Sequence, residues 1–542
     1  MKTPLRRRTV LAGSAALLVA GCTPSAPSRP PPLPSMPPVQ WLGASPARGH
    51  RLRSQNALPP PAVQHRVGAL VLGGGVAGLA AARGLLRRGV HDVHLLELED
   101  QPGGNSRGHQ LAGMPCPLGA HYLPLPGAQA REVNEWLHEL GLLRQELGRT
   151  VADERHLCHS PQERLFFEGA WVEGLLPPLE PGSASARQMQ AFAQAVAQVR
   201  RDGAGSAKQR GGAPGFTLPA HRSAWGPLQA MLDAQSFAAW LDQRGFNDKH
   251  LRWYLDYCCR DDYGATPAEV SAWAGLHYFA SRHGFHAPGD QTDREDREAV
   301  FTWPEGNAWL TQRLAAPLGE RLHGSRTVLR VIEGRHGVQV LAWDEATQRL
   351  ESWTAPFVVL ALPVFVAARI VQNPPPALRE AAACLQYAPW LVANLQLDAP
   401  LLSRQGAPAS WDNVVYGGRG LGYVDAMHQS LHPVPGATVL TAYYALPRTE
   451  RAALLADSPT PWAERVLADL RSAHPDIDRR VQCVDLMRWG HAMAIPMPGL
   501  QRHPALQALR SARGRLRFAH ADLAGYSVFE EAFTAGSEAA LA

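Results

Sequence analysis

The sequence predicts an α/β fold in which a nucleotide-binding domain is combined with a second, α+β domain. The first observation is an apolar strand, a glycine-rich turn, a helix and a second strand in direct succession within residues 67–99. The second is length, because the 477 residues after His65 suffice for a large core and two domains. The third is helical periodicity in later segments such as "QMQAFAQAVAQVRR" (188–201), which fits a helical insertion.

Residues 1–22 have the layout of a signal peptide and are excluded from the fold. A basic head precedes the apolar run 10–20, which rises only about 16 Å as a helix, against roughly 30 Å of membrane hydrocarbon. Arg7-Arg8 resembles the twin-arginine export signal, and the segment that ends at Cys22 resembles a lipobox. These resemblances imply a periplasmic protein that is tethered to the membrane by a lipid on Cys22. The alternative is an ordinary secretory signal with a chance cysteine.

Residues 23–65 contain 12 prolines and no acidic residue, which predicts a disordered tether ahead of a body that begins near Arg66. The formal net charge of +5 includes eight positive charges upstream of Arg66, so the body carries a net charge of −3. An acidic body argues against a nucleic-acid partner.

Apart from Cys22, six cysteines are scattered along the chain without a CxxC pair or the spacing of a zinc site. They are Cys116, Cys158, Cys258, Cys259, Cys384 and Cys483. We expect them to pack in the core rather than to form a disulfide framework, and we expect no metal site.

The turn "GGGVAG" (73–78) follows the predicted strand 69–72 and opens a helix, as in a Rossmann-like fold. Gly73 allows the tight turn, Gly75 lets the backbone approach a pyrophosphate, and Gly78 lets the helix pack closely on the strand. The helix N-terminus at Val76 and Ala77 offers free N–H groups to the phosphates.

A second predicted strand, 93–96, ends at Glu97, where a carboxylate can accept hydrogen bonds from an adenosine ribose. An acid at this position disfavours the ribose 2′-phosphate of NADP. The motif therefore predicts that a dinucleotide without this phosphate binds here.

A second glycine turn, "PGGNSRG" (102–108), lets the chain pass close to a long cofactor. At this point the sequence resembles the superfamily of flavin amine oxidases, phytoene desaturases and protoporphyrinogen oxidases. The resemblance continues in segments 113–123, 302–314, 325–334 and 357–363, and in the C-terminal segment 515–541. It implies FAD as the cofactor. The further cofactor-binding residues that it implies are Gly103, Gly104, Asn105, Arg107, Gly119, Ala120, Val328, Asp522 and Phe529.

The same resemblance implies how the body is divided. Residues 66–123, 301–373 and 486–542 would form the FAD-binding domain, of the Rossmann-like (GR2) type. Residues 124–300 and 374–485 would form the substrate-binding domain, which is inserted between the cofactor-binding segments.

Four residues are candidates for catalysis. His121 follows the glycine that is expected beside the flavin ring, and it is a candidate base or hydrogen-bond donor. Tyr257 and Asp261 lie in an aromatic- and acid-rich helical stretch, where a buried polar network is the alternative interpretation. His491 lies in a segment that resembles a substrate-lining strand. A packed core histidine is the alternative for His121.

The predicted function is an FAD-dependent oxidoreductase that dehydrogenates a C–N or C–C bond of a small organic substrate by hydride transfer, with oxygen or a quinone as acceptor. Lys2, Lys208 and Lys249 are the only lysines, and none matches the lysine that amine oxidases place near the flavin. Tyr526 and Phe529 also depart from the spacing of the aromatic pair around an amine. Both departures argue against an amine. The alternatives are a desaturase or isomerase of a lipid-like polyene, or a non-catalytic flavin lipoprotein acting in assembly or electron relay.

Overall fold

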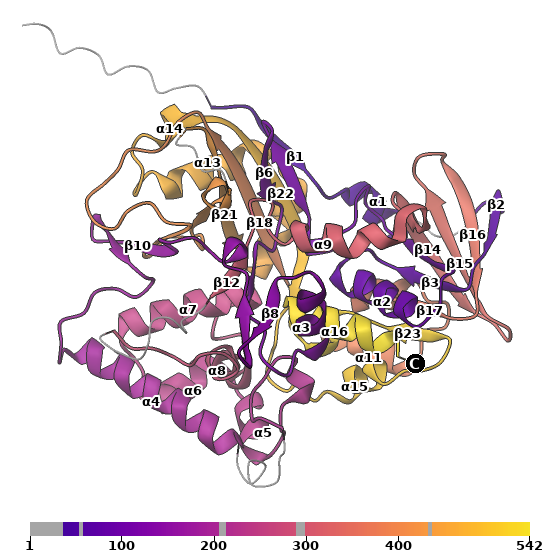
Figure 1. The fold of residues 1–542 in the computed structure, drawn as a ribbon, viewed down its shortest axis with the longest axis horizontal. Coiled ribbons are helices and arrows are strands. Elements are labelled where there is room, and N and C mark those ends of the chain that lie inside the picture. The colour runs from indigo at the N-terminus through magenta and orange to yellow at the C-terminus, as the bar shows by residue number, and fades with distance from the viewer. Residues whose placement is uncertain (1–35, 54–57, 205–212, 289–298, 432–435, 542) are drawn as a thin grey trace, which may run out of the picture. The chain divides into compact units, whose positions relative to one another are not determined.

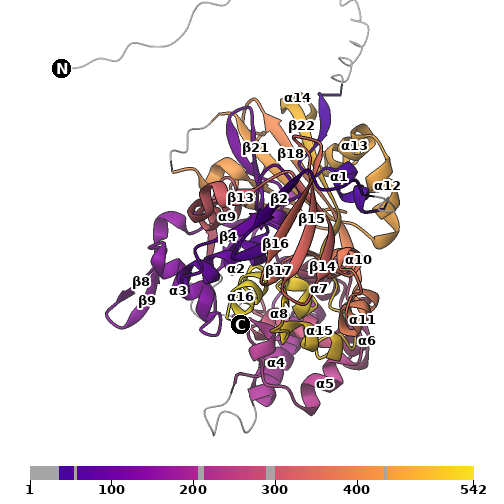
Figure 2. The same cartoon turned by 90° about the vertical axis from the view of Figure 1, so that its right-hand side faces the viewer.

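A computed structural model describes residues 36–53, 58–204, 213–288, 299–431 and 436–541. Residues Pro37–Ala542 form one compact unit, and Figures 1 and 2 show its main sheets and the helices that cover them. The predicted signal peptide and the start of the predicted tether lie outside the described residues. Within the described ranges, no helix has both the length and the apolar character needed to cross a membrane.

A five-stranded parallel sheet forms the centre of the nucleotide-binding half, with the strand order β13-β4-β3-β17-β23. Its strands are β3 (Ala69–Leu72), β4 (Val93–Leu96), β13 (Leu322–His323), β17 (Val358–Leu360) and β23 (Leu516–Phe518). Every residue of β3 and β17 is buried, as expected for a sheet covered on both faces. The predicted strands 69–72 and 93–96 are confirmed, and strands from the later segments join them as the resemblance implied.

Six helices of the described residues belong to this half: α2 (Val76–Arg87), α9 (Ala308–Ala315), α10 (Val364–Ile370), α11 (Pro376–Cys384), α15 (Pro504–Arg510) and α16 (Phe529–Ala539). The C-terminal helix α16 lies beside α2, the first helix of the nucleotide-binding motif (Figure 1). A Cβ atom on Gly536 would lie 2.0 Å from the carbonyl oxygen of Ala77, so only glycine permits this approach. The two ends of the body therefore meet at the nucleotide-binding motif.

An antiparallel meander packs against this half. Its strands are β14 (Arg326–Glu333), β15 (Val338–Asp344) and β16 (Arg349–Ala355). Their buried faces join the apolar cluster that also contains residues of β3 and β17.

An eight-stranded mixed sheet forms the centre of the other half, with the order β1-β22-β18-β21-β20-β19-β10-β11. Its strands are β1 (Val39–Leu42), β10 (Glu163–Phe167), β11 (Ala170–Glu173), β18 (Tyr387–Leu397), β19 (Asp412–Val415), β20 (Tyr423–Asp425), β21 (Thr438–Ala445) and β22 (Val481–Ala494). Since β22 pairs with β18 along most of its length, residues 486–494 belong to this sheet and not to the FAD-binding half as predicted. Conversely, α11 packs on α10 and α15, so residues 376–384 belong to the nucleotide-binding half.

Nine helices accompany the second half or connect it to the first within the described ranges. They are α3 (Arg131–Glu139), α4 (Ala184–Ala204), α5 (Pro227–Asp233), α6 (Phe237–Gln243), α7 (Lys249–Tyr263), α8 (Ala272–Ala280), α12 (Arg451–Ala456), α13 (Pro459–Leu470) and α14 (Ile477–Arg480). Short ribbons pair β5 (Gly108–Leu111) with β6 (Met114–Pro117), β7 (Tyr122–Pro124) with β12 (Val300–Thr302), and β8 (Leu143–Glu146) with β9 (Arg149–Ala152).

The prediction of a disordered tether over residues 23–65 is wrong for its described part. Strand β1 pairs in parallel with β22, helix α1 (Pro46–His50) follows, and β2 (Val63–Arg66) adds a fourth strand to the meander beside β16. The prolines near these strands precede them, at 37–38 and 59–61, so they remove no N–H group from either strand, and the run Val39–Leu42 gives β1 side chains to pack. The proline content of the whole segment hid this short run.

All six body cysteines are unpaired. Cys116, Cys258 and Cys259 are buried, as predicted, whereas Cys158, Cys384 and Cys483 are only half-buried. Burial raises the pKa of the Cys116 thiol to about 12. Among the residues described, no group of three or more His, Cys, Asp or Glu side chains is arranged to hold a metal ion.

Candidate active site

The two glycine turns meet and form a cradle of backbone. The N–H of Gly103 donates to the carbonyl of Gly74 over 2.7 Å, and a Cβ on Gly75 would meet only the Cα of Gly104, at 3.9 Å. The first backbone bond of α2 runs from Leu79 N to Gly75 O, so the N–H groups of the preceding turn have no acceptor within the helix. This open, N–H-lined cradle fits the pyrophosphate of a dinucleotide.

Glu97 lies at the end of β4, next to this cradle. Its carboxylate accepts hydrogen bonds from the N–H groups of Gly74 (2.6 Å) and Glu99 (2.9 Å). Burial raises the pKa of Glu97, and these bonds oppose the shift. Strand β14 starts beside Glu97, where Arg326 N donates to Glu97 O over 2.8 Å. Val328 lies two residues further along this strand.

The second glycine turn also holds the segment that was predicted to lie beside the flavin. Ala120 N donates to Asn105 O over 2.8 Å, and a Cβ on Gly119 would lie 2.2 Å from the same oxygen. The guanidinium of Arg107 lies over the Trp489 ring, and its buried Nε atom has no hydrogen-bond partner among the described residues. An orphaned buried donor beside the glycine cradle supports the fit of a large polar cofactor.

Asp522, in the C-terminal segment, is buried and has hydrogen-bond partners within the protein. The Asp522 carboxylate accepts hydrogen bonds from Val364 N (2.9 Å) at the start of α10 and from the Tyr387 hydroxyl (2.7 Å) at the start of β18. Burial opposes its ionisation, but His520 and these two donors hold the pKa of Asp522 below its ordinary value. A cofactor contact of Asp522 stays a prediction.

Helix α16 begins at Phe529. The Phe529 ring packs in the core, 5.9 Å from the Phe533 ring and 6.3 Å from the Trp136 ring. Any contact of Phe529 with the cofactor would therefore use its backbone N–H at the helix N-terminus. The next residue, Glu530, has its side chain in the cavity described below.

A cavity of about 250 Å³ lies where the two halves face each other. Helix α7 supplies Tyr254, Tyr257 and Asp261, whose spacing places them on one face of the helix. The start of α7 is fixed by Asp248, whose side chain accepts from the N–H groups of His250 and Leu251, and Gly264 ends it in a left-handed conformation. Other lining residues come from β7, β10, β19, β21 and α16.

Four acidic residues from the described part of the chain line this cavity. Glu163 and Asp412 are register partners on the parallel strands β10 and β19, Asp261 accepts from the Tyr122 hydroxyl over 3.2 Å, and Glu530 lies in the first turn of α16. Burial raises the pKa of Asp261 and of Glu530 to about 7, and it raises the pKa of Asp412 well above its usual range, with Glu163 and Asp261 adding to that shift. A cationic ligand would compensate the cost of ionising these buried carboxyl groups and their mutual repulsion.

Aromatic side chains and one cation complete the lining. The His121 ring stacks on Tyr443 with centroids 4.3 Å apart, and Trp411 lies 5.5 Å from the same imidazole. Arg282 also lines the cavity and pairs with Asp262 at 3.2 Å. Arg282 offsets only part of the cost of ionising Asp261 and Glu530, because the pKa values of both carboxyl groups stay raised.

The structure brings three of the four catalytic candidates together. His121, Tyr257 and Asp261 all line the cavity. Burial lowers the pKa of His121 to about 3, so the imidazole is neutral at physiological pH and is a hydrogen-bonding group rather than a strong base. His491 is not among the lining residues, because its ring packs on Phe365 (4.7 Å) and Tyr387 (5.9 Å), and this corrects its expected position.

Sequence reasoning missed Glu163, Asp412, Glu530, Trp411 and Tyr443. Glu530 could have been found from the sequence, because it directly follows Phe529, which the resemblance implies as a cofactor-binding residue. Glu163 and Asp412 meet only through the pairing of β10 with β19, which residue spacing does not reveal.

The sequence profile of the family described as flavin-containing amine oxidoreductases matches residues 76–542. A protein of Mycobacterium tuberculosis described as a flavin-containing monoamine oxidase is 26% identical over 311 residues, which cover 57% of this chain and 60% of that protein. The matched region therefore spans less than two thirds of this relative.

Solved structures share the fold. A putrescine oxidase bound to putrescine superposes with a TM-score of 0.65 at 19% identity, covering 88% of this chain and 99% of the other. A cyclohexylamine oxidase from Brevibacterium oxydans gives 0.64 at 19% identity, with 88% and 98% covered. A CLA-producing fatty acid isomerase from P. acnes gives 0.60 at 15% identity, with 87% and 97% covered. The family match shows that the chain belongs to the flavin-containing amine oxidoreductases, and the shared fold and the glycine cradle agree with FAD as its cofactor.

Proposed function

We propose that this enzyme oxidises a small amine that enters the cavity as a cation. The observation that carries the proposal is the set of four carboxyl groups in one cavity with aromatic walls. Buried carboxyl groups are costly to ionise unless a cation compensates them, and an ammonium group does so. Aromatic faces such as those of Trp411 and Tyr443 add a further attraction for a cation. This favours an amine, against the interpretation drawn from the missing lysine.

The residues of the cavity have two tasks in this reaction. FAD, when bound, supplies the two-electron oxidation. Asp261 and Asp412 bind the ammonium group and orient the carbon next to it. Asp261, with a pKa near 7, is also suited to take the proton that the ammonium group must lose before its nitrogen lone pair becomes available. His121 and Tyr443 form a wall that excludes water.

The alternatives fit the cavity less well. A lipid-like polyene has no charge to compensate four carboxyl groups, although the fold is shared with a fatty acid isomerase. A purely structural or electron-relay flavoprotein gives no reason for a cavity lined by ionisable groups. For the enzyme, we propose oxygen or a quinone as the electron acceptor.

Anaerobic reduction of the purified flavoprotein tests this proposal. We expect a panel of primary amines and diamines to contain compounds that bleach the flavin absorbance, whereas the alcohols of the same chain length leave it unchanged. Comparing each amine with the alcohol of the same chain length shows whether flavin reduction requires the charge of the substrate or only its shape. Bleaching by an alcohol, a polyene or a fatty acid in place of every amine contradicts the proposal, and so does a flavin that no compound reduces.

We further propose export by the twin-arginine route, followed by lipidation of Cys22. The residues concerned lie outside the described part of the chain. The physical support is that FAD is loaded in the cytoplasm, so the protein must fold around it before it crosses the membrane, and the twin-arginine route carries folded proteins.

Changing both Arg7 and Arg8 to Lys is therefore expected to leave the loaded protein in the cytoplasm, as measured by cell fractionation and immunoblotting. The matched control is Arg6→Lys, which changes the neighbouring arginine and spares the pair. A double variant that reaches the periplasm at the wild-type level contradicts this route. Separately, Cys22→Ser is expected to release the protein from the membrane fraction.

A further inference from the structure

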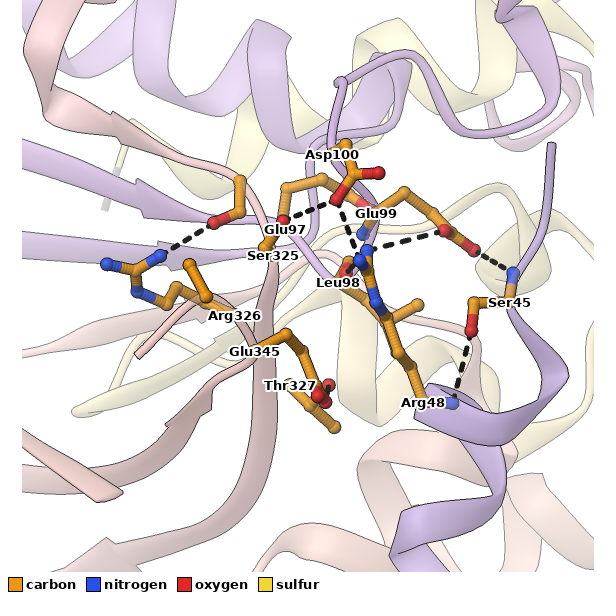
Figure 3. A network of polar contacts seen from close by, with 12 residues as sticks. Ser45, Arg48, Glu97, Leu98, Glu99, Asp100, Ser325, Arg326, Thr327 and Glu345 are labelled. Atoms are coloured by element: carbon orange, nitrogen blue, oxygen red, sulfur yellow. Dashed lines mark hydrogen bonds and ion pairs between the residues drawn. The ribbon is translucent and has the colours of Figure 1, made fainter. Parts of the chain in front are cut away.

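Residues 37–53, which we call the strap, bind the turn that carries the ribose-binding acid. Figure 3 shows Arg48 and Ser45 of the strap against the turn Glu97–Asp100. The Arg48 guanidinium lies 2.8 Å from the Asp100 carboxylate and donates to Leu98 O over 3.1 Å. Ser45 N donates to the Glu99 carboxylate over 3.0 Å. The strap therefore fixes both backbone and side chains of this turn.

A second anchor holds the strap on the meander. Arg51 donates to both carboxylate oxygens of Glu345, over 2.9 and 3.2 Å, and its guanidinium lies over the Trp343 ring. Glu345 also accepts from the Thr327 hydroxyl over 2.9 Å, so this contact reaches β14 next to Val328. Leu52 is buried, and its carbonyl accepts from Arg369 over 2.9 Å.

The strap also contacts the second glycine turn and the other sheet. Arg107 donates to Gly43 O over 3.1 Å. At Gly43 the chain turns from β1 to α1 with a φ of 88°, and a Cβ there would lie 2.4 Å from the sulfur of Met487 on β22. The strap thus bridges three cofactor-binding segments and the eight-stranded sheet.

The charges in this region explain why such a bridge is needed. The turn Glu97–Asp100 carries three carboxylates in four residues, beside a site for a cofactor with an anionic pyrophosphate. Like charges at this spacing repel each other and the ligand, and Arg48 and Arg107 lie close enough to offset them. The strap lies outside residues 76–542, which the family profile matches.

We propose that the strap retains FAD, with Arg48 and Arg51 as positioning residues that hold the adenosine end of its site. The inference rests on the FAD site and not on the proposed amine substrate. In the wild type the strap keeps the Glu97–Asp100 turn in the arrangement that receives the ribose. Without its two arginines the turn gains freedom that binding must remove, so FAD leaves faster and binds more weakly.

The test compares FAD retention and protein stability in the full-length holoenzyme. We expect Arg48→Ala with Arg51→Ala to release FAD about 5- to 30-fold faster, followed by the rise in fluorescence of freed FAD. Lysine at both positions should restore much of the retention, because it keeps the charges. The matched control is Arg471→Ala, which removes a similar two-nitrogen contact, with Asp478, elsewhere on the surface.

The apoprotein separates retention from a merely structural role. We expect the alanine pair to lower the melting temperature of the holoenzyme by clearly more than that of the apoprotein. Equal losses in both forms, or a release rate within twofold of the wild type, overturn the proposal. If the alanine pair does not fold, Glu345→Gln weakens the Arg51 anchor from outside the strap and is judged by the same two measurements.

Discussion

Gly78→Ala is expected to leave the protein colourless, although it adds a single methyl group. The new Cβ would lie 1.9 Å from the carbonyl oxygen of Gly73 and 3.2 Å from the Cβ of Ala361. Neither neighbour is the end of a flexible side chain, and Gly73 already has a φ of 100° that only glycine adopts easily. The turn between β3 and α2 must therefore shift, and with it the N–H groups that form the cradle.

The direction of the effect on stability distinguishes this explanation from simple helix propensity. Alanine in place of glycine inside a helix normally stabilises it by up to about 1 kcal/mol. Here we expect destabilisation of about 1–3 kcal/mol, typical of overpacking against a rigid neighbour. FAD binding should weaken by at least about tenfold, because 1.4 kcal/mol corresponds to a factor of ten.

The flavin-to-protein absorbance ratio after purification measures the loss of FAD, and thermal unfolding followed by circular dichroism measures stability. The matched control is Gly514→Ala, since a Cβ at Gly514 meets no atom within 4 Å and the residue is exposed. A yellow Gly78→Ala protein that is more stable than the wild type contradicts this account of the motif.

The parts of the fold that the sequence predicts well are those set by local chemistry. Strands β3 and β4 are buried apolar runs bounded by glycine and by an acid, so their ends can be placed from residue types alone. His121, Tyr257 and Asp261 were found because each lies beside a recognisable motif or on one face of a helix. In these cases the information lies within a few residues of the site.

Contacts between distant segments explain what the sequence does not predict. Glu163 and Asp412 become neighbours only through strand pairing, and Asp522 contacts α10 and Tyr387 because of the way the last strand enters the sheet. The strap was missed for a related reason. Its proline content suits disorder, but its partners at Glu99, Glu345 and Met487 lie far away in the chain.

The second large effect is expected from Asp261→Asn, which keeps the size of the side chain and an oxygen that accepts from Tyr122. Removing one partner of a desolvated charge pair commonly costs about 2–5 kcal/mol, so kcat/KM for a cationic amine should fall by about 30-fold or more.

The pH dependence of kcat/KM follows from the raised pKa of Asp261. Below about pH 7 the Asp261 carboxyl is neutral, so the wild-type kcat/KM should fall as the pH is lowered through this value. In the Asp261→Asn variant, this fall of kcat/KM at acidic pH should be absent.

Stability decides between catalysis and a purely structural role for Asp261. Its folded-state pKa, about 7, is raised above the ordinary value, so its contribution to stability is complete at low pH and is lost as the pH rises through 7. Asparagine has no such ionisation, and the variant should gain stability relative to the wild type between pH 5 and pH 8. Asp233→Asn is the matched control, because burial raises the pKa of that carboxyl to about 6 outside the cavity. It should share the stability change and keep kcat/KM. If Asp261 binds the substrate, the Asn variant loses activity and gains stability relative to the wild type. If Asp261 only holds helices together, the variant loses both activity and stability.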